Sequence, residues 1–313
     1  MSGRPRARAR LELALAALLF ATGGPAIKAC TLGAWEIACL RSLVAALTLV
    51  VFFRPPLAAF GFAAARVGLV HGATLVLFVA ANKLTTASHA IFLQDSSVLY
   101  VLLFAPWLLG ERLTRGDLPV MLLVVLGMGL LFGGGHAAQP TAPDPALGNL
   151  LAAASGVTWA LTVVGMRALA RQSGRAGPEP TPGAGGGNSG AALAAVILGN
   201  AFACLGTSIP AWNAWSAGGG AALGDSVPWN DAAWILYLGA VQIALAYVFV
   251  ARGLSGVGAL EGSLILLVEP VLNSLLTWAV HGESPGTLGL VGGAAILGAT
   301  AVKAWNERAS PRV

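Results

Sequence analysis

Long apolar runs, separated by short polar connections, follow one another along the whole chain. The runs are continuous rather than alternating, which favours helices over strands. A helix of about 20 residues rises about 30 Å, which matches the hydrocarbon core of a bilayer. The pattern therefore predicts an all-α polytopic membrane protein with ten transmembrane helices. The predicted spans are 10–28, 33–53, 65–84, 86–108, 116–134, 147–169, 191–211, 231–252, 257–280 and 286–304.

The composition agrees with a membrane protein. Hydrophobic residues make up 57% of the 313 residues and charged residues only 10%, with a mean hydropathy of +0.78. Soluble domains carry about 25% charged residues, so this chain could not cover itself with polar surface, and we expect a lipid bilayer around it. The net charge of +5 does not indicate a nucleic-acid partner, because the basic residues lie between apolar runs rather than on one folded surface.

Lys and Arg fall on one side of the predicted membrane. With the N-terminus inside, the inner connections and the tails hold all of the 18 basic residues except Lys28, Arg41 and Lys83. The positive-inside rule then places both termini in the cytoplasm. The start RPRARAR followed by LALAALLF also fits a secretory signal peptide, whose removal would leave nine helices.

The chain divides into two sets of five runs. We expect a basic N-tail (1–9), a first five-helix repeat (10–134), an outer linker (135–146), a second repeat (147–304) and a C-tail (305–313), with a Gly- and Pro-rich disordered inner loop at 171–190. The fourth run ends in PWLLGERL and the ninth in TWAVHGES. Five spans per half would insert the second copy upside down, and inverted repeats are typical of alternating-access transporters.

The stretches ANKLTTASHAIFLQDSSVLYVLLFAPWLLGERL (81–113) and LLVEPVLNSLLTWAVHGESPG (266–286) resemble the two halves of an EamA-type member of the drug/metabolite transporter superfamily. The resemblance implies a ten-helix inverted repeat in the inner membrane of a prokaryote. It also implies a secondary transporter that moves a small organic metabolite, such as an amino acid, with export as the expected direction. Such proteins often carry Pro in the middle of both the fourth and the ninth helix. Pro270 is present in the ninth, but the fourth has none near Ser97–Val98.

Polar residues at the midpoints of the spans are the candidate site. An ionisable side chain at the bilayer centre costs about 2.5–3.5 kcal/mol on insertion scales, so it usually faces a cavity or a partner. The run FLQDSSVLY (92–100) places an Asp in the middle of the fourth span. The predicted substrate-cavity residues are Gln94, Asp95, Ser97, Thr158, Trp159, Gln242, Glu269 and Asn273.

Two interpretations of the charged residues stay open at this point. Asp95 and Glu269 could line the cavity and couple transport to protons. Alternatively, Asp95 is a hydrogen-bonded structural residue and Glu269 forms an ion pair with Arg41 that holds two helices together. Arg41, Glu269 and Asp95 are therefore candidates for an ion pair or for proton coupling.

Other chemistry has no motif in the sequence. There is no Walker-type Gly loop and no zinc-spaced set of Cys and His, so we expect no cofactor and no metal. Two rival functions remain: a membrane-embedded enzyme that uses Asp95 and Glu269 on a lipid-soluble substrate, and a non-transporting scaffold or sensor. The spacings Gly129–Gly133 and Gly289–Gly293 fit close helix packing, either within the chain or in a homodimer. The sequence as a whole favours a transporter of a small-molecule solute rather than an enzyme.

Overall fold

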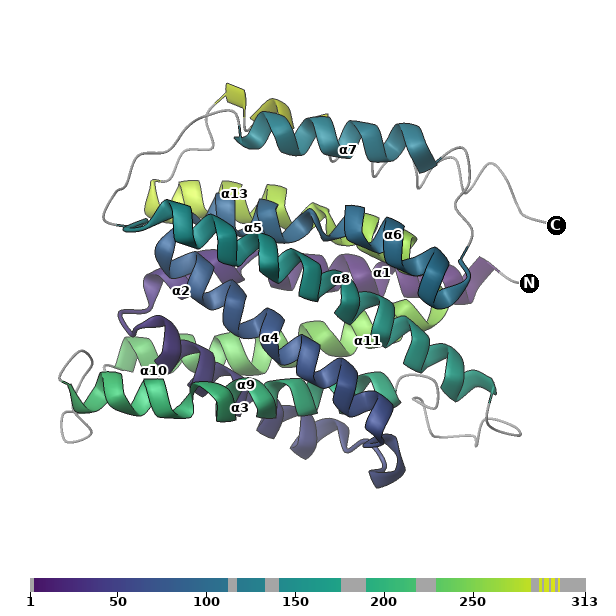
Figure 1. Cartoon of the computed structure of the whole chain (residues 1–313), viewed down its shortest axis with the longest axis horizontal. Helices are drawn as coiled ribbons and strands as arrows, with labels where there is room; N and C mark the ends of the chain where they lie inside the picture. Colours follow the sequence, from purple (N-terminus) through teal and green to yellow (C-terminus); the bar gives the residue numbers. More distant parts are fainter. Residues whose placement is uncertain are drawn as a thin grey trace.

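A computed structural model describes residues 3–111, 117–132, 141–175, 190–217 and 229–282, and positions within 287–298. These residues form a bundle of helices that run roughly alongside one another (Figure 1). The first half contains α1 (Gly3–Phe20), α2 (Gly23–Ala29), α3 (Ala34–Phe53), the short 3₁₀ turn η1 (Leu57–Ala59), α4 (Phe62–Leu84), α5 (Ala87–Asp95), α6 (Ser97–Leu109) and α7 (Asp117–Phe132). The second half contains α8 (Pro145–Arg175), α9 (Gly190–Ser216), α10 (Trp229–Leu236), the π-helical segment η2 (Tyr237–Leu245), α11 (Ala246–Gly256), α12 (Ala259–Leu266) and α13 (Val268–His281).

Eight stretches of the described residues are helical, long and apolar enough to cross a membrane. They correspond to the predicted spans one to four and six to nine, which confirms the all-α, multi-span class. The fifth predicted span appears as α7, which has 16 residues in the described part. The tenth span lies largely outside the described residues, and so do the C-tail, most of the inner loop and much of the outer linker. The count of ten and the domain limits therefore stay predictions.

The two halves are packed into each other rather than side by side. Helix α4 lies against α8 and α9, α3 lies against α9, and α1 lies against α11. The largest hydrophobic cluster accordingly joins Leu13 of α1 to Met166 of α8 and Val250 of α11. Because one face of α1 lies in this core, cleavage of the first span as a signal peptide would remove part of the interior of the protein.

Small residues let α4 and α9 approach closely. A Cβ added to Gly72 would lie 2.7 Å from the carbonyl oxygen of Gly199, which leaves no room for a side chain. Such contacts are common between membrane helices, because lipid supplies no hydrophobic drive and close van der Waals packing replaces it. By contrast, a Cβ at Gly129 on α7 would meet nothing within 4 Å, and Gly133, Gly289 and Gly293 lie outside the described residues. The homodimer therefore stays a prediction.

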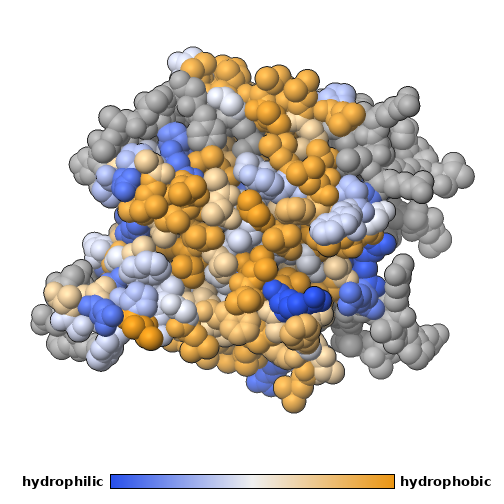
Figure 2. Space-filling view, viewed as in Figure 1, coloured by the Kyte–Doolittle hydropathy of each residue, from blue (hydrophilic) through white to orange (hydrophobic). Residues whose placement is uncertain are grey.

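The surface carries an apolar belt. Figure 2 shows hydrophobic residues over most of the visible face, with hydrophilic residues gathered toward the ends of the helices. Leu47, Leu69 and Leu103 are exposed in the middle of their helices. Exposed tryptophans lie near helix ends, as in the aromatic belts of membrane proteins. They are Trp35, Trp107, Trp212, Trp229 and Trp278.

Several membrane-crossing segments are interrupted partway along. The first breaks at Ala21 and Thr22, between α1 and α2, and the fourth breaks at Ser96, between α5 and α6. The ninth breaks at Leu267, between α12 and α13, and the eighth widens into the π-helical segment η2. Broken helices expose backbone groups, which inside a membrane is tolerated only where the protein or a cavity surrounds them.

Different residues cause the breaks in the fourth and ninth spans. In the ninth, Pro270 has no N–H, so it cannot bond to the carbonyl one turn earlier. In the fourth, which has no proline at its break, the Ser96 hydroxyl donates to the Leu93 carbonyl (2.6 Å) and offers the backbone an alternative partner. Both segments then end at a glycine with a left-handed backbone, Gly110 (φ 64°) and Gly282 (φ 71°).

Oxidation should join α3 to α9 covalently. The sulfur atoms of Cys39 and Cys204 lie 3.5 Å apart, so a small movement brings them to the disulfide distance of about 2.0 Å. We expect copper–phenanthroline to form an intramolecular Cys39–Cys204 disulfide, detected by peptide mass spectrometry. Cys30 is the internal control, because it is buried and lies on a different segment, directly after α2, so it should stay reduced. Pairing of Cys30 with either of the others would contradict the helix arrangement.

Candidate functional site

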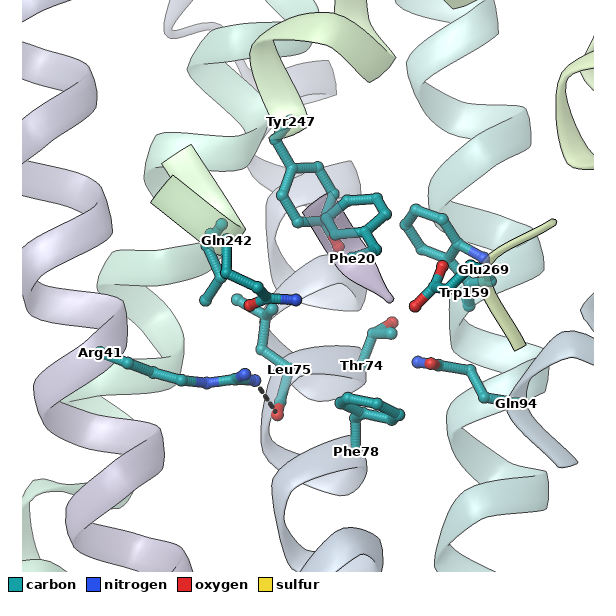
Figure 3. A pocket seen from close by; sticks show the side chains of 11 residues that line it. Phe20, Arg41, Thr74, Leu75, Phe78, Gln94, Trp159, Gln242, Tyr247 and Glu269 are labelled. Atoms are coloured by element: carbon teal, nitrogen blue, oxygen red, sulfur yellow. Dashed lines mark hydrogen bonds between the residues drawn. The ribbon is translucent and has the colours of Figure 1, made fainter. Parts of the chain in front are cut away.

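A small cavity lies among the helices where the interrupted segments meet. Its volume is about 30 Å³, and a buried water needs about 10–15 Å³ on this measure, so the cavity has room for about two waters. The walls come from both halves of the chain (Figure 3). The lining residues are Phe20, Arg41, Thr74, Leu75, Phe78, Gln94, Trp159, Gln242, Ile243, Tyr247 and Glu269.

The helix breaks deliver several of these side chains to the cavity. Phe20 is the last residue of α1, Gln94 is the penultimate residue of α5, and Glu269 is the second residue of α13. Gln242 lies in the π-helical segment, and Tyr247 is the second residue of α11 directly after it. A π-helical turn shifts the helix register, and such turns are frequent at functional sites. The cavity therefore owes its shape to the irregular backbone.

Two ionisable side chains of opposite charge face each other across the cavity. Figure 3 places Arg41 on one side and Glu269 on the other. Arg41 is 1% exposed, and its Nη2 donates to the Leu75 carbonyl at 3.0 Å, while its Nε has no partner. No ion pair joins Arg41 to Glu269 in the described part of the chain, since the salt bridges found there involve other residues. Both groups are thus left with unused bonding capacity toward the cavity.

Three aromatic rings form one wall. Phe20 meets Tyr247 with ring centres 5.0 Å apart and Trp159 with ring centres 6.2 Å apart, and the Trp159 and Tyr247 rings lie 5.9 Å apart. All three contacts are edge-to-face, which is the favoured geometry for aromatic pairs. Such a wall offers an apolar surface and an electron-rich face that attracts cations.

Two amide side chains complete the polar lining. Gln94 Nε2 donates to the Ser155 hydroxyl of α8 at 2.8 Å, which fixes the amide across the boundary between the halves. Gln242 is buried with its Oε1 unpartnered. A Cβ at Gly23 would lie 2.6 Å from Gln242 Nε2, so any larger residue there would push this amide aside.

Four of the predicted cavity residues lie outside the lining in this structure. Asp95 is buried beside the cavity at the end of α5, and Ser97 is buried at the start of α6. Thr158 instead donates to the Ser155 carbonyl of its own helix at 3.0 Å. Asn273 packs against Gly24 of α2. Adjacent positions on a helix point about 100° apart, which is why Gln94 faces the cavity and Asp95 does not.

Several lining residues had no signal in the sequence. Phe20, Phe78 and Tyr247 look like ordinary members of apolar runs, and Thr74 is a single hydroxyl in such a run. The hint that the sequence offers is the position of two of these residues beside a helix-weakening stretch or a polar residue. Phe20 directly precedes ATGG, a helix-weakening stretch, and Tyr247 lies five residues after Gln242.

Ion pairs join the two halves at one end of the bundle, here called the basic end, where α1 begins and α8 ends. Glu111, just after α6, accepts from Arg167 Nε of α8 (3.1 Å) and from the Ala259 backbone N–H of α12 (2.9 Å). Glu261 of α12 accepts from Arg6 (2.6 Å) and Arg10 (2.7 Å) of α1. Each acid therefore connects a segment of the first half to one of the second.

Hydrogen bonds also join the two halves at the opposite end of the bundle. Asp231 of α10 accepts from the Thr31 backbone N–H (2.8 Å) and from the Thr31 hydroxyl. His281 Nε2 donates to the Pro25 carbonyl (2.9 Å), and Thr85 bonds to Asn149 (2.8 Å). Ion pairs at the basic end and hydrogen bonds at the opposite end thus hold the halves together on both sides of the cavity.

The fold and the site define a multi-span membrane protein with a small polar cavity between two interlocked halves. Within the described residues, no group of three or more His, Cys, Asp or Glu could hold a metal ion. A sequence model described as the EamA-like transporter family matches the chain over residues 9–133 and 187–304. The chain therefore belongs to the EamA-like transporter family, whose members are membrane transporters of small solutes.

A search of curated proteins finds no match. Among solved structures, one described as "Crystal structure of protein" is similar, with a TM-score of 0.67 and 20% sequence identity over 97% of this chain and 99% of that chain. At this identity the likeness shows a shared fold and nothing about the solute.

Loss of the Glu111 charge should destabilise the protein. Glu111→Gln keeps the size of the side chain but weakens its bonds to Arg167 and the Ala259 N–H, which are charge-assisted and largely shielded from solvent. We expect a loss of about 1–2 kcal/mol, because hydrogen bonds to charged groups contribute about 1.5–3 kcal/mol when buried. Thermal unfolding in detergent measures the change.

The matched control is Glu12→Gln. Its partner Arg8 is 76% exposed, so the pair should contribute little. Equal shifts in melting temperature for the two variants would show that the basic end is not held by Glu111.

Proposed function

We propose that this protein is a secondary transporter that carries a small zwitterionic solute, such as an amino acid with an apolar side chain, by alternating access. The observation that supports this most is the placement of Arg41 and Glu269 on opposite sides of one buried cavity without pairing to each other. Buried charges are normally paired, so an arrangement that leaves a cation and an acid apart suits a ligand that brings both opposite charges.

Each part of such a solute has a partner in the lining. Its carboxylate would face Arg41, whose planar fork matches carboxylates, and its ammonium would face Glu269. The rings of Phe20, Trp159 and Tyr247 would pack against the apolar side chain and attract the ammonium.

The present conformation is too tight for such a solute. A cavity of about 30 Å³ must widen before an amino acid enters, so binding requires movement of the surrounding helices. Rocking of the halves would open one end while the other stays closed. The ion pairs of Glu111 and Glu261 and the bonds of Asp231 and His281 would break in alternation.

Two inverted repeats would allow two equivalent conformations, one open to each side of the membrane. The family model matches two separate stretches of the chain, and both the fourth and the ninth spans break in the middle and end at a left-handed glycine. We propose ten helices in this arrangement. Both termini would lie in the cytoplasm of a prokaryotic inner membrane, because the basic end carries the N-terminal arginines.

The rival enzymatic function has less support. An acid–base pair acting on a lipid-soluble substrate should have both carboxyl groups facing the reaction site, but Asp95 lies outside the lining. A scaffold would have no need for buried polar groups without partners. We therefore prefer transport to both rivals.

Binding of three related probes tests the site. L-phenylalanine carries both charges, phenethylamine lacks the carboxylate, and 3-phenylpropionate lacks the ammonium. We expect purified protein to bind L-phenylalanine most tightly, measured by calorimetry, and reconstituted protein to move it across liposomes. Arg41→Met and Glu269→Gln should each weaken its binding about 10- to 100-fold, since loss of a charged hydrogen-bond partner costs about 1.5–3 kcal/mol.

Arg66→Met is the matched control, because Arg66 lies at the exposed start of α4 over the Phe62 ring. It should bind L-phenylalanine like the unmodified protein. Equal affinity for the three probes, or unchanged binding in Arg41→Met, would reject the zwitterion site. Hydrolysis of a lipid without any solute flux would favour the enzyme instead.

A further inference from the structure

Two buried carboxyl groups lie at or beside the cavity, one from each half of the chain. Asp95 is 3% exposed at the end of α5, and Glu269 is 7% exposed at the start of α13, two segments that pack against each other. Gln94, the neighbour of Asp95 in α5, lines the same cavity as Glu269, so the break of each span brings one acid to this place. Asp95 Oδ2 has no hydrogen-bond partner, and within the described residues neither acid forms an ion pair. Two uncompensated anions at this depth would repel each other, so the pair needs a neutralising partner.

The charges around the cavity balance with one added proton. Arg41 is the buried cation of the lining, and it can compensate one carboxylate but not two. With both acids ionised, this interior would carry a net charge of −1; with one proton on the pair it is neutral. Neutrality matters here because charges in the bilayer centre are expensive to maintain.

We propose that Asp95 and Glu269 share one proton, and that this proton moves onto Asp95 when the ammonium group of a solute binds Glu269. The second part rests on the proposed transport function. Asp95 is then a proton-holding residue that does not touch the solute, whereas Glu269 binds it.

The helices packed around Asp95 and Glu269 contain few other side chains that could hold this proton. Helix α4, which contacts α5, offers His71, whose ring lies 4.5 Å from that of Tyr247 on α11. His89 at the start of α5 bonds to Thr86 (2.8 Å). The charged groups near the helix ends, Lys28, Lys83, Glu261 and His281, bond to backbone carbonyls or arginines there.

A proton fits this place better than a metal ion. Hard cations require six or more oxygen ligands in most protein sites, and the described residues contain no cluster of three acids, His or Cys. A proton needs only two oxygen atoms, and carboxyl pairs at short range hold one for this reason.

The charge of the solute then decides whether a proton is released. A zwitterion brings a carboxylate to Arg41 and an ammonium to Glu269, so the site stays neutral with the proton on Asp95. An amine without a carboxylate adds one positive charge, and neutrality requires that the pair release its proton to water on the open side. Transport of the zwitterion is therefore independent of the pH gradient, and transport of the amine exchanges one cation for one proton.

Infrared spectroscopy tests the shared proton without any solute. The purified protein should show the C=O stretch of a protonated carboxylic acid that shifts in D2O. Asp95→Asn and Glu269→Gln should each remove it, whereas the control Glu12→Gln should leave it in place. Absence of the band, or its persistence in both variants, would overturn the proposal even if the protein transports solutes.

Proton release on binding tests the second part. In weakly buffered detergent solution containing a pH dye, phenethylamine should release about one proton per molecule bound and L-phenylalanine none. Asp95→Asn should abolish the release and weaken amine binding about tenfold or more, because the acid that gives up the proton is gone. Equal release with both probes would contradict the charge balance. If neither probe binds but the infrared band is present, the carboxyl pair stands and the proposed solute class fails.

Discussion

Every backbone N–H and C=O group inside a bilayer must find its partner within the protein, and this constraint explains most of the structure. Regular helices satisfy it, and the described chain is helical almost throughout its apolar runs. The departures are few and lie around one cavity: the gap at Thr22, the turns at Ser96 and Leu267, and the π-helical segment η2. Hydroxyl groups help at two of them, since Thr22 and Ser96 each donate to a carbonyl three residues earlier. Within the described spans, irregular backbone is therefore confined to the surroundings of the cavity.

The same breaks bring charge into the interior. Glu269 follows the break of the ninth span, Asp95 precedes that of the fourth, and Arg41 approaches from the regular helix α3. These groups are too deep to be solvated by bulk water, so they have to balance one another, a proton and the solute. We therefore expect the electrical neutrality of this interior to connect the charge of the solute with the protonation of the Asp95–Glu269 pair.

Much of the fold and part of the candidate site could be predicted from the sequence. There is a physical reason why the rest could not. The membrane class follows from apolar runs of the right length. Gln94, Trp159, Gln242 and Glu269 could be picked out because polar or large amphipathic residues are unusual at mid-depth. Phe20 and Tyr247 could not, because an aromatic residue in an apolar run looks the same whether it faces lipid or a cavity. Gln94 and Asp95 are neighbours in sequence, and only the folded position of α5 decides which of them faces the cavity.

Access to the cavity from both sides of the membrane is the central claim, and thiol labelling measures it directly. Thr74 lines the cavity, and Thr74→Cys in a background with Cys30, Cys39 and Cys204 replaced by Ser would place a single thiol there. A membrane-impermeant methanethiosulfonate should label it in right-side-out and in inside-out vesicles, and L-phenylalanine should slow the labelling in both. Labelling from one side only, or from neither, would contradict alternating access around this cavity.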